Sequence, residues 1–134
     1  MLGDWRVTPH INVQDISRAT KFYRDNLGLK EVGPSKHGTI LECADGSRVG
    51  LVEFPDDPDA QHEHTVLGFD VDNVQMEVQK LKDAGIEFIE YSLDDGVEVS
   101  GQSIETKGGI AKIRGSLVAW FRDSEGNILS IDSK

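Results

Sequence analysis

Residues 8–15, which read TPHINVQD, and residues 22–28, which read FYRDNLG, decide the fold of this chain. The first stretch alternates like a strand and ends at Asp15, a residue type that caps helix N-termini well. The second stretch continues a helical spacing of apolar residues that begins after Asp15, and Gly28 ends it. The two stretches therefore predict a strand, a capped helix and a glycine stop.

The predicted first strand has two faces of different kinds. Apolar side chains alternate with hydroxyl, imidazole and amide side chains: Val7, Ile11 and Val13 against Thr8, His10 and Asn12. A period of two residues is typical of a half-buried strand. Pro9 places this strand at an edge or at its own start, because proline has no N–H for the ladder. The polar face is therefore a candidate for contact with a ligand.

A weaker copy of the same pattern occupies the second half of the chain. A polar, proline-bearing connection at residues 55–63 comes first, and Asp72-Asn73-Val74-Gln75 then has the form of a capping box. Gly85 ends the second helix, and residues 93–109 are expected to form a long acidic, glycine-rich loop. The predicted strands, besides the one around Ile11, are 29–33, 37–44, 47–54, 66–71, 86–91, 117–121 and 128–131.

Each half therefore reads as strand, helix and three strands, and such a repeat predicts a paired architecture. One helix can shield only one face of its sheet, so we expect the two halves to need each other. The predicted fold class is α+β, with two βαβββ modules forming curved mixed sheets around a cavity and helices on the outside. Residues 1–134 would form a single domain, with module 1 at about 5–54, a linker at 55–63 and module 2 at about 64–134.

Composition limits the class of partner. The formal net charge of −10 argues against nucleic-acid binding, which needs a cationic surface for phosphates. No apolar run has the length of a membrane helix, and the first residues do not read as a signal peptide. Cys43 is the only cysteine, which excludes an internal disulfide and fits a reducing cytoplasm. We therefore expect a cytoplasmic protein that binds neither nucleic acid nor membrane.

With these residues in view, the chain resembles the vicinal oxygen chelate superfamily, the glyoxalase, bleomycin-resistance and extradiol-dioxygenase group. The matching segments follow the family's order along nearly the whole chain: 11–15, 22–28, 68–74, 81–85 and 121–127. The resemblance implies paired βαβββ modules, often in homodimers. It also implies a wide range of functions, from metal-dependent isomerases and dioxygenases to metal-free proteins that sequester antibiotics.

The resemblance also implies where a metal would be bound. The family's ligand positions fall at Thr8, Val66 and Ser130, with a fourth near Glu53, where relatives carry His, Gln or Glu. A catalytic divalent ion needs several such ligands and an open position for substrate. Threonine, valine and serine do not supply them, so the sequence predicts a member without a metal cofactor.

An alternative stays open at this point. His10 and His64 each lie two residues from an expected ligand position, which preserves the side of a strand that the residue faces. Together with Glu53 they could hold a divalent metal in a lyase, isomerase or dioxygenase of the same superfamily. The sequence does not decide whether the chain is an enzyme, and it identifies no catalytic residue.

The first hypothesis is a protein, resembling the bleomycin-resistance branch, that binds a small aromatic or cationic compound in the cavity between modules and forms a homodimer. A pocket with an aromatic wall and a few polar groups is typical of small-molecule sites. The residues expected to contact the ligand are Thr8, His10, Asn12, Val66, Trp120 and Ser130. The ligand's identity, and whether modules pair within one chain or between two, do not follow from the sequence.

Overall fold

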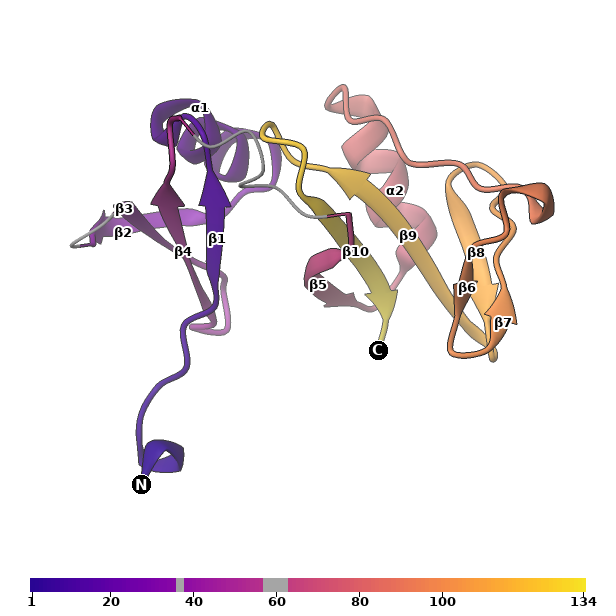
Figure 1. The fold of residues 1–134 in the computed structure, drawn as a ribbon, viewed down its shortest axis with the longest axis horizontal. Coiled ribbons are helices and arrows are strands. Elements are labelled where there is room, and N and C mark those ends of the chain that lie inside the picture. The colour runs from indigo at the N-terminus through magenta and orange to yellow at the C-terminus, as the bar shows by residue number, and fades with distance from the viewer. Residues whose placement is uncertain (36–37, 57–62) are drawn as a thin grey trace. The chain divides into compact units, whose positions relative to one another are not determined.

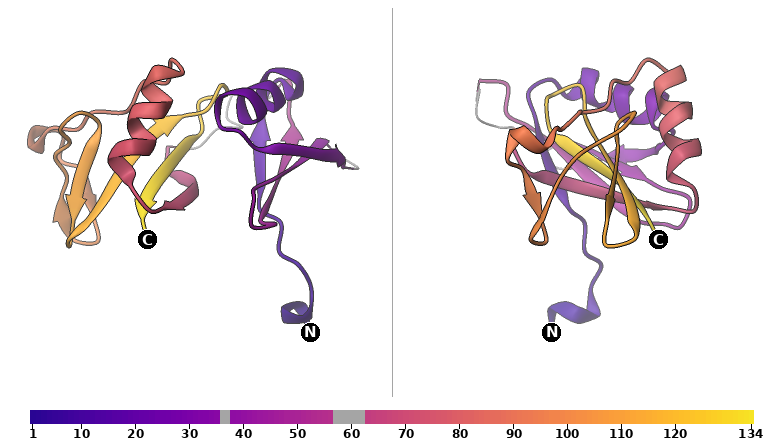
Figure 2. Two further views of the ribbon diagram at one scale, coloured as in Figure 1. Left: turned by 180° about the vertical axis from the view of Figure 1, so that it is seen from behind. Right: turned by 90° about the vertical axis from the view of Figure 1, so that its right-hand side faces the viewer.

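A computed structural model describes residues 1–35, 38–56 and 63–134. The chain divides into two compact units, unit 1 at Met1–Gln61 and unit 2 at His62–Lys134. Each unit has a four-stranded mixed sheet and one α-helix (Figure 1 and Figure 2). This architecture confirms the predicted α+β class with two mixed sheets. Most of the predicted linker, residues 57–62, lies outside the described residues.

Unit 1 follows the predicted order of strand, helix and three strands. The strand order in the sheet is β1-β4-β3-β2, with β1 parallel to β4 and the other pairs antiparallel. Asp15 caps the helix as predicted, because its side chain accepts a hydrogen bond from the backbone N–H of Arg18. The elements are η1 (Leu2–Asp4), β1 (His10–Val13), α1 (Ile16–Lys21), η2 (Phe22–Asn26, a π-helical turn), β2 (Lys30–Pro34), β3 (Gly38–Glu42) and β4 (Arg48–Glu53).

Helix α1 covers one face of the unit 1 sheet. Thr20 of α1 lies against Thr39 of β3, with their hydroxyl oxygens 3.5 Å apart. Apolar side chains of that face are buried beneath the helix: Ile11, Val13, Leu41, Val49 and Leu51. Residues ahead of β1 extend away from this sheet (Figure 1), and Trp5 is exposed over 74% of its surface. The alternation read from the sequence therefore separates a buried face from a polar one.

Unit 2 repeats the plan with additional short strands. Its sheet has the order β5-β10-β9-β8, in which β5 is parallel to β10. Asn73 caps α2 by accepting from the backbone N–H of Met76 at 3.0 Å. The elements are β5 (Thr65–Val71), α2 (Val74–Asp83), η3 (Leu93–Asp95), β6 (Glu98–Val99), β7 (Gln102–Ser103), β8 (Ile110–Ile113), β9 (Ser116–Arg122) and β10 (Ile128–Ser133).

The prediction of a strand at residues 86–91 is wrong. In this segment only Phe88 forms a bridge, to Phe121, and the N–H of Ile89 donates to the carbonyl of Trp120. The same edge of β9 is already paired with β8, whose Ile110 lies opposite Ala119. Because β8 takes most of that edge, residues 86–91 pair only with its last part. The predicted loop at 93–109 likewise contains a short hairpin, β6 and β7.

Unit 2 buries apolar side chains on both faces of its sheet. Helix α2 packs against β9 and β10, where it buries Val74 and Val78. Phe121 and Leu129 lie in register beneath it. The opposite face carries a second buried cluster around Trp120. Within the described ranges, no helix combines the length and apolar character needed to cross a membrane.

Candidate functional site

His10 and Asn12 lie on the face of the unit 1 sheet that α1 leaves uncovered. The register pairs His10 with Gly50, whereas the buried Ile11 pairs with the buried Leu51. Successive residues of a strand point to opposite faces, so His10 and Asn12 share the side away from α1. We call this side the helix-free face of unit 1.

Gly50 makes room for the imidazole of His10. A Cβ at residue 50 would lie 2.9 Å from His10 Cδ2 and 3.4 Å from His10 Nε2. It would also lie 3.5 Å from Ile40 Cδ1 on the next strand. The ring of His10 therefore lies across β4 over the glycine and remains exposed to solvent. A polar group held in this way is available to a ligand on the helix-free face of unit 1.

The structure does not bring Glu53 together with His10. Glu53 pairs with Val13, whose side chain is fully buried on the α1 side of the sheet. The two proposed metal ligands of unit 1 therefore point to opposite faces. Thr8 is half-buried and precedes β1, and the carbonyl of the following Pro9 accepts from Gly50 N at 2.8 Å.

Ser130 and Trp120 lie side by side on the face of the unit 2 sheet opposite α2. The register pairs Ser130 with Trp120 on β9 and with Gly68 on β5. Ser130 is 5% exposed, and its Oγ donates to Asp132 Oδ2 at 2.7 Å. A Cβ at residue 68 would lie 2.9 Å from Ser130 Oγ. Here too a glycine lies beside a predicted ligand-binding side chain.

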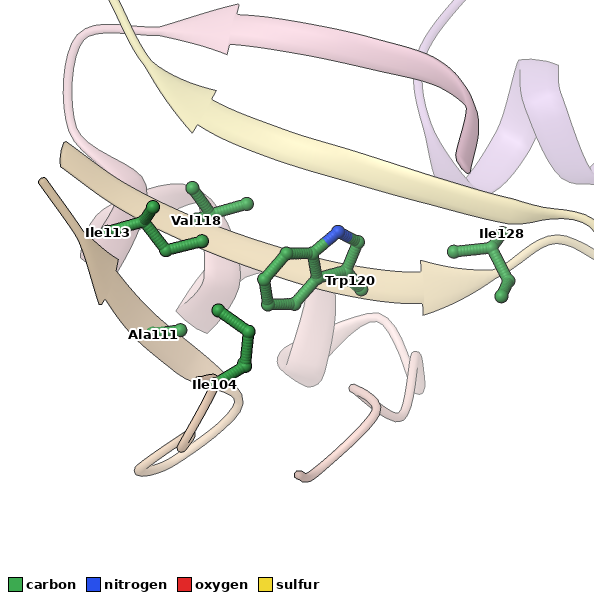
Figure 3. Close-up of a cluster of buried hydrophobic side chains, with 6 residues drawn as sticks. All are labelled: Ile104, Ala111, Ile113, Val118, Trp120 and Ile128. Atoms are coloured by element: carbon green, nitrogen blue, oxygen red, sulfur yellow. The ribbon is translucent and has the colours of Figure 1, made fainter. Parts of the chain in front are cut away.

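Trp120 belongs to a core of its own on this face (Figure 3). The indole is only 7% exposed and makes an edge-on contact with the ring of Tyr91, with centroids 5.7 Å apart. Val97 and Val99, from the acidic segment and β6, pack against the same cluster. The cluster comprises Ile104, Ala111, Ile113, Val118, Trp120 and Ile128. The chain itself thus covers the part of the face formed by β8 and β9.

Two carboxylates that the sequence reasoning missed share the open part of this face. Asp132 follows Ser130 by two residues on β10, and the register places it opposite Asp70 on β5. Asp70 is exposed and Asp132 is half-buried. The signal was present in the sequence, because residues two apart on a strand share a face. We define the helix-free face of unit 2 as Gly68, Asp70, Trp120, Ser130 and Asp132.

Val66 and His64 lie where β5 begins. Thr65 is opposite Ile128 but Leu67 is opposite Leu129, so β5 contains one extra residue at Val66 relative to β10. This bulge makes simple alternation unreliable before Leu67. Val66 is half-buried, and His64 is exposed just ahead of the strand.

The residues present do not fit a catalytic metal in either unit. Among the described residues of each unit, no group of at least three His, Cys, Asp or Glu side chains is placed to hold an ion. Valine at 66 has no donor atom, and Ser130 offers only a neutral hydroxyl where catalytic divalent ions take imidazole or carboxylate ligands. The chemistry available on the two helix-free faces is hydrogen bonding, charge attraction and aromatic contact.

Cys43 does not have the environment of a nucleophile. Burial raises the pKa of its thiol above the ordinary value, and Asp45 acts in the same direction, although a hydrogen bond with Ser47 opposes them. A thiolate is the reactive form, so this cysteine is kept in its unreactive state near neutral pH.

Comparisons with known proteins agree with this fold. The sequence profile of the Glyoxalase/Bleomycin resistance protein/Dioxygenase superfamily matches residues 6–131. A search of curated proteins gives no match.

Solved structures of similar fold cover nearly the whole chain. A glyoxalase family protein from Enterococcus faecalis is 16% identical, with a TM-score of 0.69 over 99% of this chain and 100% of that one. Lactoylglutathione lyase from Agrobacterium tumefaciens is 15% identical, with a TM-score of 0.62 over 96% and 92%. The fosfomycin resistance protein FosX from Listeria monocytogenes is 14% identical, with a TM-score of 0.63 over 97% and 93%. A mutant of FosX was solved with manganese(II) and a dihydroxypropylphosphonic acid. At these identities the likeness shows the fold alone.

Proposed function

Because this chain belongs to the glyoxalase/bleomycin resistance protein/dioxygenase superfamily, we propose that it binds a small aromatic or cationic organic compound without a metal cofactor. The helix-free faces of the two units would supply the contacts. His10 and Asn12 would orient the ligand from unit 1, and Ser130 would do so from unit 2. Thr8 and Val66 are further proposed contacts, and the edge of Trp120 would give apolar contact. That the ligand lies in a cavity between modules stays a prediction.

One observation carries this proposal. In each unit the predicted polar side chain on the helix-free face has a glycine in register on the neighbouring strand, Gly50 for His10 and Gly68 for Ser130. A larger side chain at either glycine would collide with the polar group. The clearance lets each polar group lie against the neighbouring strand on its helix-free face. The paired glycines support a role in contacting a small molecule.

The donor set supports a function without metal. Of the four family ligand positions, Val66 cannot coordinate, Thr8 and Ser130 offer neutral hydroxyls, and Glu53 faces away from His10. The alternative, a metal-dependent lyase, isomerase or dioxygenase that uses His10, Glu53 and His64, would need Glu53 and His10 on one face. FosX, solved with manganese(II), has the same fold at low identity, so the metal content needs a direct test.

Metal analysis separates the two functions. The protein is purified without a histidine tag, incubated with manganese, iron, nickel and zinc salts, desalted, and assayed for metal per chain by mass spectrometry. We expect far less than one ion per chain, unchanged in His10→Ala and Glu53→Ala. A stoichiometric ion that is lost in both variants would overturn the metal-free proposal and establish the alternative.

Ligand binding is tested by a thermal-shift screen of small aromatic and cationic compounds, because a ligand that binds only the native state raises its stability. We expect hits whose stabilisation falls in His10→Ala and Ser130→Ala. Lys30→Ala, an exposed substitution on β2, is the matched control. Equal shifts in all variants would remove both helix-free faces from the binding site.

Two further parts of the proposal concern the whole protein. We propose that it is a homodimer, in line with the superfamily resemblance, and light scattering coupled to size-exclusion chromatography measures its mass directly. A mass equal to that of one chain, 14.8 kDa, across a range of concentrations would rule the homodimer out. The cytoplasmic location stays a prediction.

A further inference from the structure

The helix-free face of unit 2 carries two negative charges in direct register. Asp70 on β5 lies opposite Asp132 on β10, in a parallel pair of strands. Like charges at paired positions of a sheet repel each other. Lys134, the nearest cation along the chain, binds Asp72 at 2.8 Å instead. Among the described residues, no basic side chain forms an ion pair with Asp70 or Asp132.

The neighbouring Ser130 hydroxyl faces the same charges. Its proton is used in the hydrogen bond to Asp132 Oδ2, so the lone pairs of Oγ are left to accept a hydrogen bond. Ser130 Oγ and Asp132 Oδ2 both lie close to Gly68 on β5, since a Cβ there would lie 2.9 and 3.1 Å from them. The carboxylates of Asp70 and Asp132 and the hydroxyl of Ser130 therefore form a group of three acceptors on the helix-free face of unit 2.

The indole N–H of Trp120 lies on the same face as these acceptors. Trp120 is in register with Ser130, and 7% of its surface is exposed. Within the described part of the chain, no acceptor pairs with its Nε1–H. Figure 3 shows the ring nitrogen on the side of the indole toward β10. The nitrogen is not among the fully buried atoms that lack a partner, so this N–H reaches the surface of the otherwise buried ring, where the acceptor of a ligand can take it.

Building on the proposed function, we propose that this face selects a ligand carrying a positively charged amine close to a hydrogen-bond acceptor such as a carbonyl. The ammonium group would donate to Asp132, Asp70 and Ser130 Oγ, where it would relieve the repulsion between the carboxylates. The acceptor would take the N–H of Trp120. The general class proposed above, aromatic or cationic, is thereby narrowed to amines.

Three matched probes test the charge and the acceptor separately. Phenylalanine amide has both groups, phenylpropionamide keeps the carbonyl but lacks the amine, and phenylethylamine keeps the amine but lacks the carbonyl. Each is titrated into ¹⁵N-labelled full-length protein in the Trp5→Phe background, so that the remaining indole N–H signal belongs to Trp120. Backbone signals of Gly68, Ser130 and Asp132 report the position of binding.

We expect phenylalanine amide to bind about fivefold more tightly than phenylpropionamide, the gain typical of a partly exposed ion pair. Asp132→Asn should abolish this fivefold preference for the amine, since asparagine keeps an acceptor for Ser130 but removes the charge. Asp72→Asn, which changes the net charge equally, should preserve it. The Trp120 indole signal should move with the two carbonyl compounds and much less with phenylethylamine.

The outcomes separate this inference from the proposed function. If phenylpropionamide binds this face as tightly as phenylalanine amide, or if the preference survives Asp132→Asn, the selection for amines is wrong while binding of small molecules stands. If none of the probes moves these signals at millimolar concentration, both proposals fail. An equal loss of preference in Asp72→Asn would show attraction by overall charge and would also overturn the inference.

Discussion

Placing a methyl group at residue 68 should break the contact that shapes the unit 2 face. The Cβ of Gly68→Ala would lie 2.9 Å from Ser130 Oγ and 3.1 Å from Asp132 Oδ2. Contacts this short do not persist between unbonded atoms, so either the hydroxyl turns away or β5 shifts. Turning the hydroxyl away breaks its 2.7 Å hydrogen bond to Asp132.

The expected loss can be worked out from this geometry. A hydrogen bond to a charged group contributes about 1.5–3 kcal/mol, and the half-buried position of Asp132 favours the lower end, about 1.5 kcal/mol. Replacing glycine by alanine also restricts the unfolded chain, which stabilises the native state by about 0.4–1 kcal/mol. The free energy of unfolding should therefore fall by about 0.5–1 kcal/mol.

A double-mutant cycle isolates the cause. In Ser130→Ala the hydrogen bond is already absent and the closest contact is gone. Gly68→Ala should then be neutral or stabilising by up to about 0.5 kcal/mol, so the coupling between the two positions is about 0.5–1.5 kcal/mol. Urea unfolding followed by Trp120 fluorescence in the Trp5→Phe background reports on unit 2 alone. If the changes in unfolding free energy of the two single variants add up to that of the double variant within about 0.3–0.5 kcal/mol, the reasoning is refuted.

Three further predictions rest on other parts of the structure. Gly50→Ala should push the exposed ring of His10 off β4, changing stability by less than about 0.5 kcal/mol because a surface side chain can move aside; the ring signals of His10 in NMR spectra should nevertheless shift. Cys43 should react slowly with iodoacetamide at neutral pH, because its thiol pKa is raised by burial. The stability from keeping this thiol protonated is complete below the unfolded-state pKa and declines as pH rises through the folded-state value, so Cys43→Ser should flatten the alkaline part of a stability–pH curve. Phe121→Ala removes a ring that is only 1% exposed. It should lower the free energy of unfolding in urea by about 3–5 kcal/mol, and a loss below about 1 kcal/mol would contradict the place of Phe121 in the core.

Local chemistry in the sequence predicted the elements well. The caps at Asp15 and Asn73 and the glycines that end both helices act through neighbouring backbone groups, so they can be read from a few residues. Gly28 and Gly85 both have positive φ angles, 80° and 90°. The two faces of β1 were likewise predictable, because alternation depends only on the strand's own residues.

The errors came from interactions between distant segments. Residues 86–91 have the composition of a strand, but β8 competes for the same edge of β9, and no local pattern reveals that competition. The cluster that covers most of Trp120, formed by Ile104 and neighbours from the loop and hairpin, was likewise not predicted; the ligand contact of Trp120 stays a prediction.

The faces on which the proposed site residues lie were predictable where they depended on strand parity alone. Ser130 and His10 were identified from their strands, and both lie on helix-free faces. Asp132 was missed although it follows from the same parity, because it lies outside the family's ligand positions. The glycines beside His10 and Ser130 could not be assigned without the register between strands.

Because of the bulge at Val66, β5 pairs with β10 in one register before this residue and in another after it. From Leu67 onward each residue keeps its partner on β10, while Thr65 is displaced by one position. A one-residue change in the connection ahead of β5 could thus be absorbed at Val66 without moving Gly68 away from Ser130. A chelating side chain grafted at position 65 would join the face of Ile128 and Ser130, whereas alternation alone would have chosen position 66.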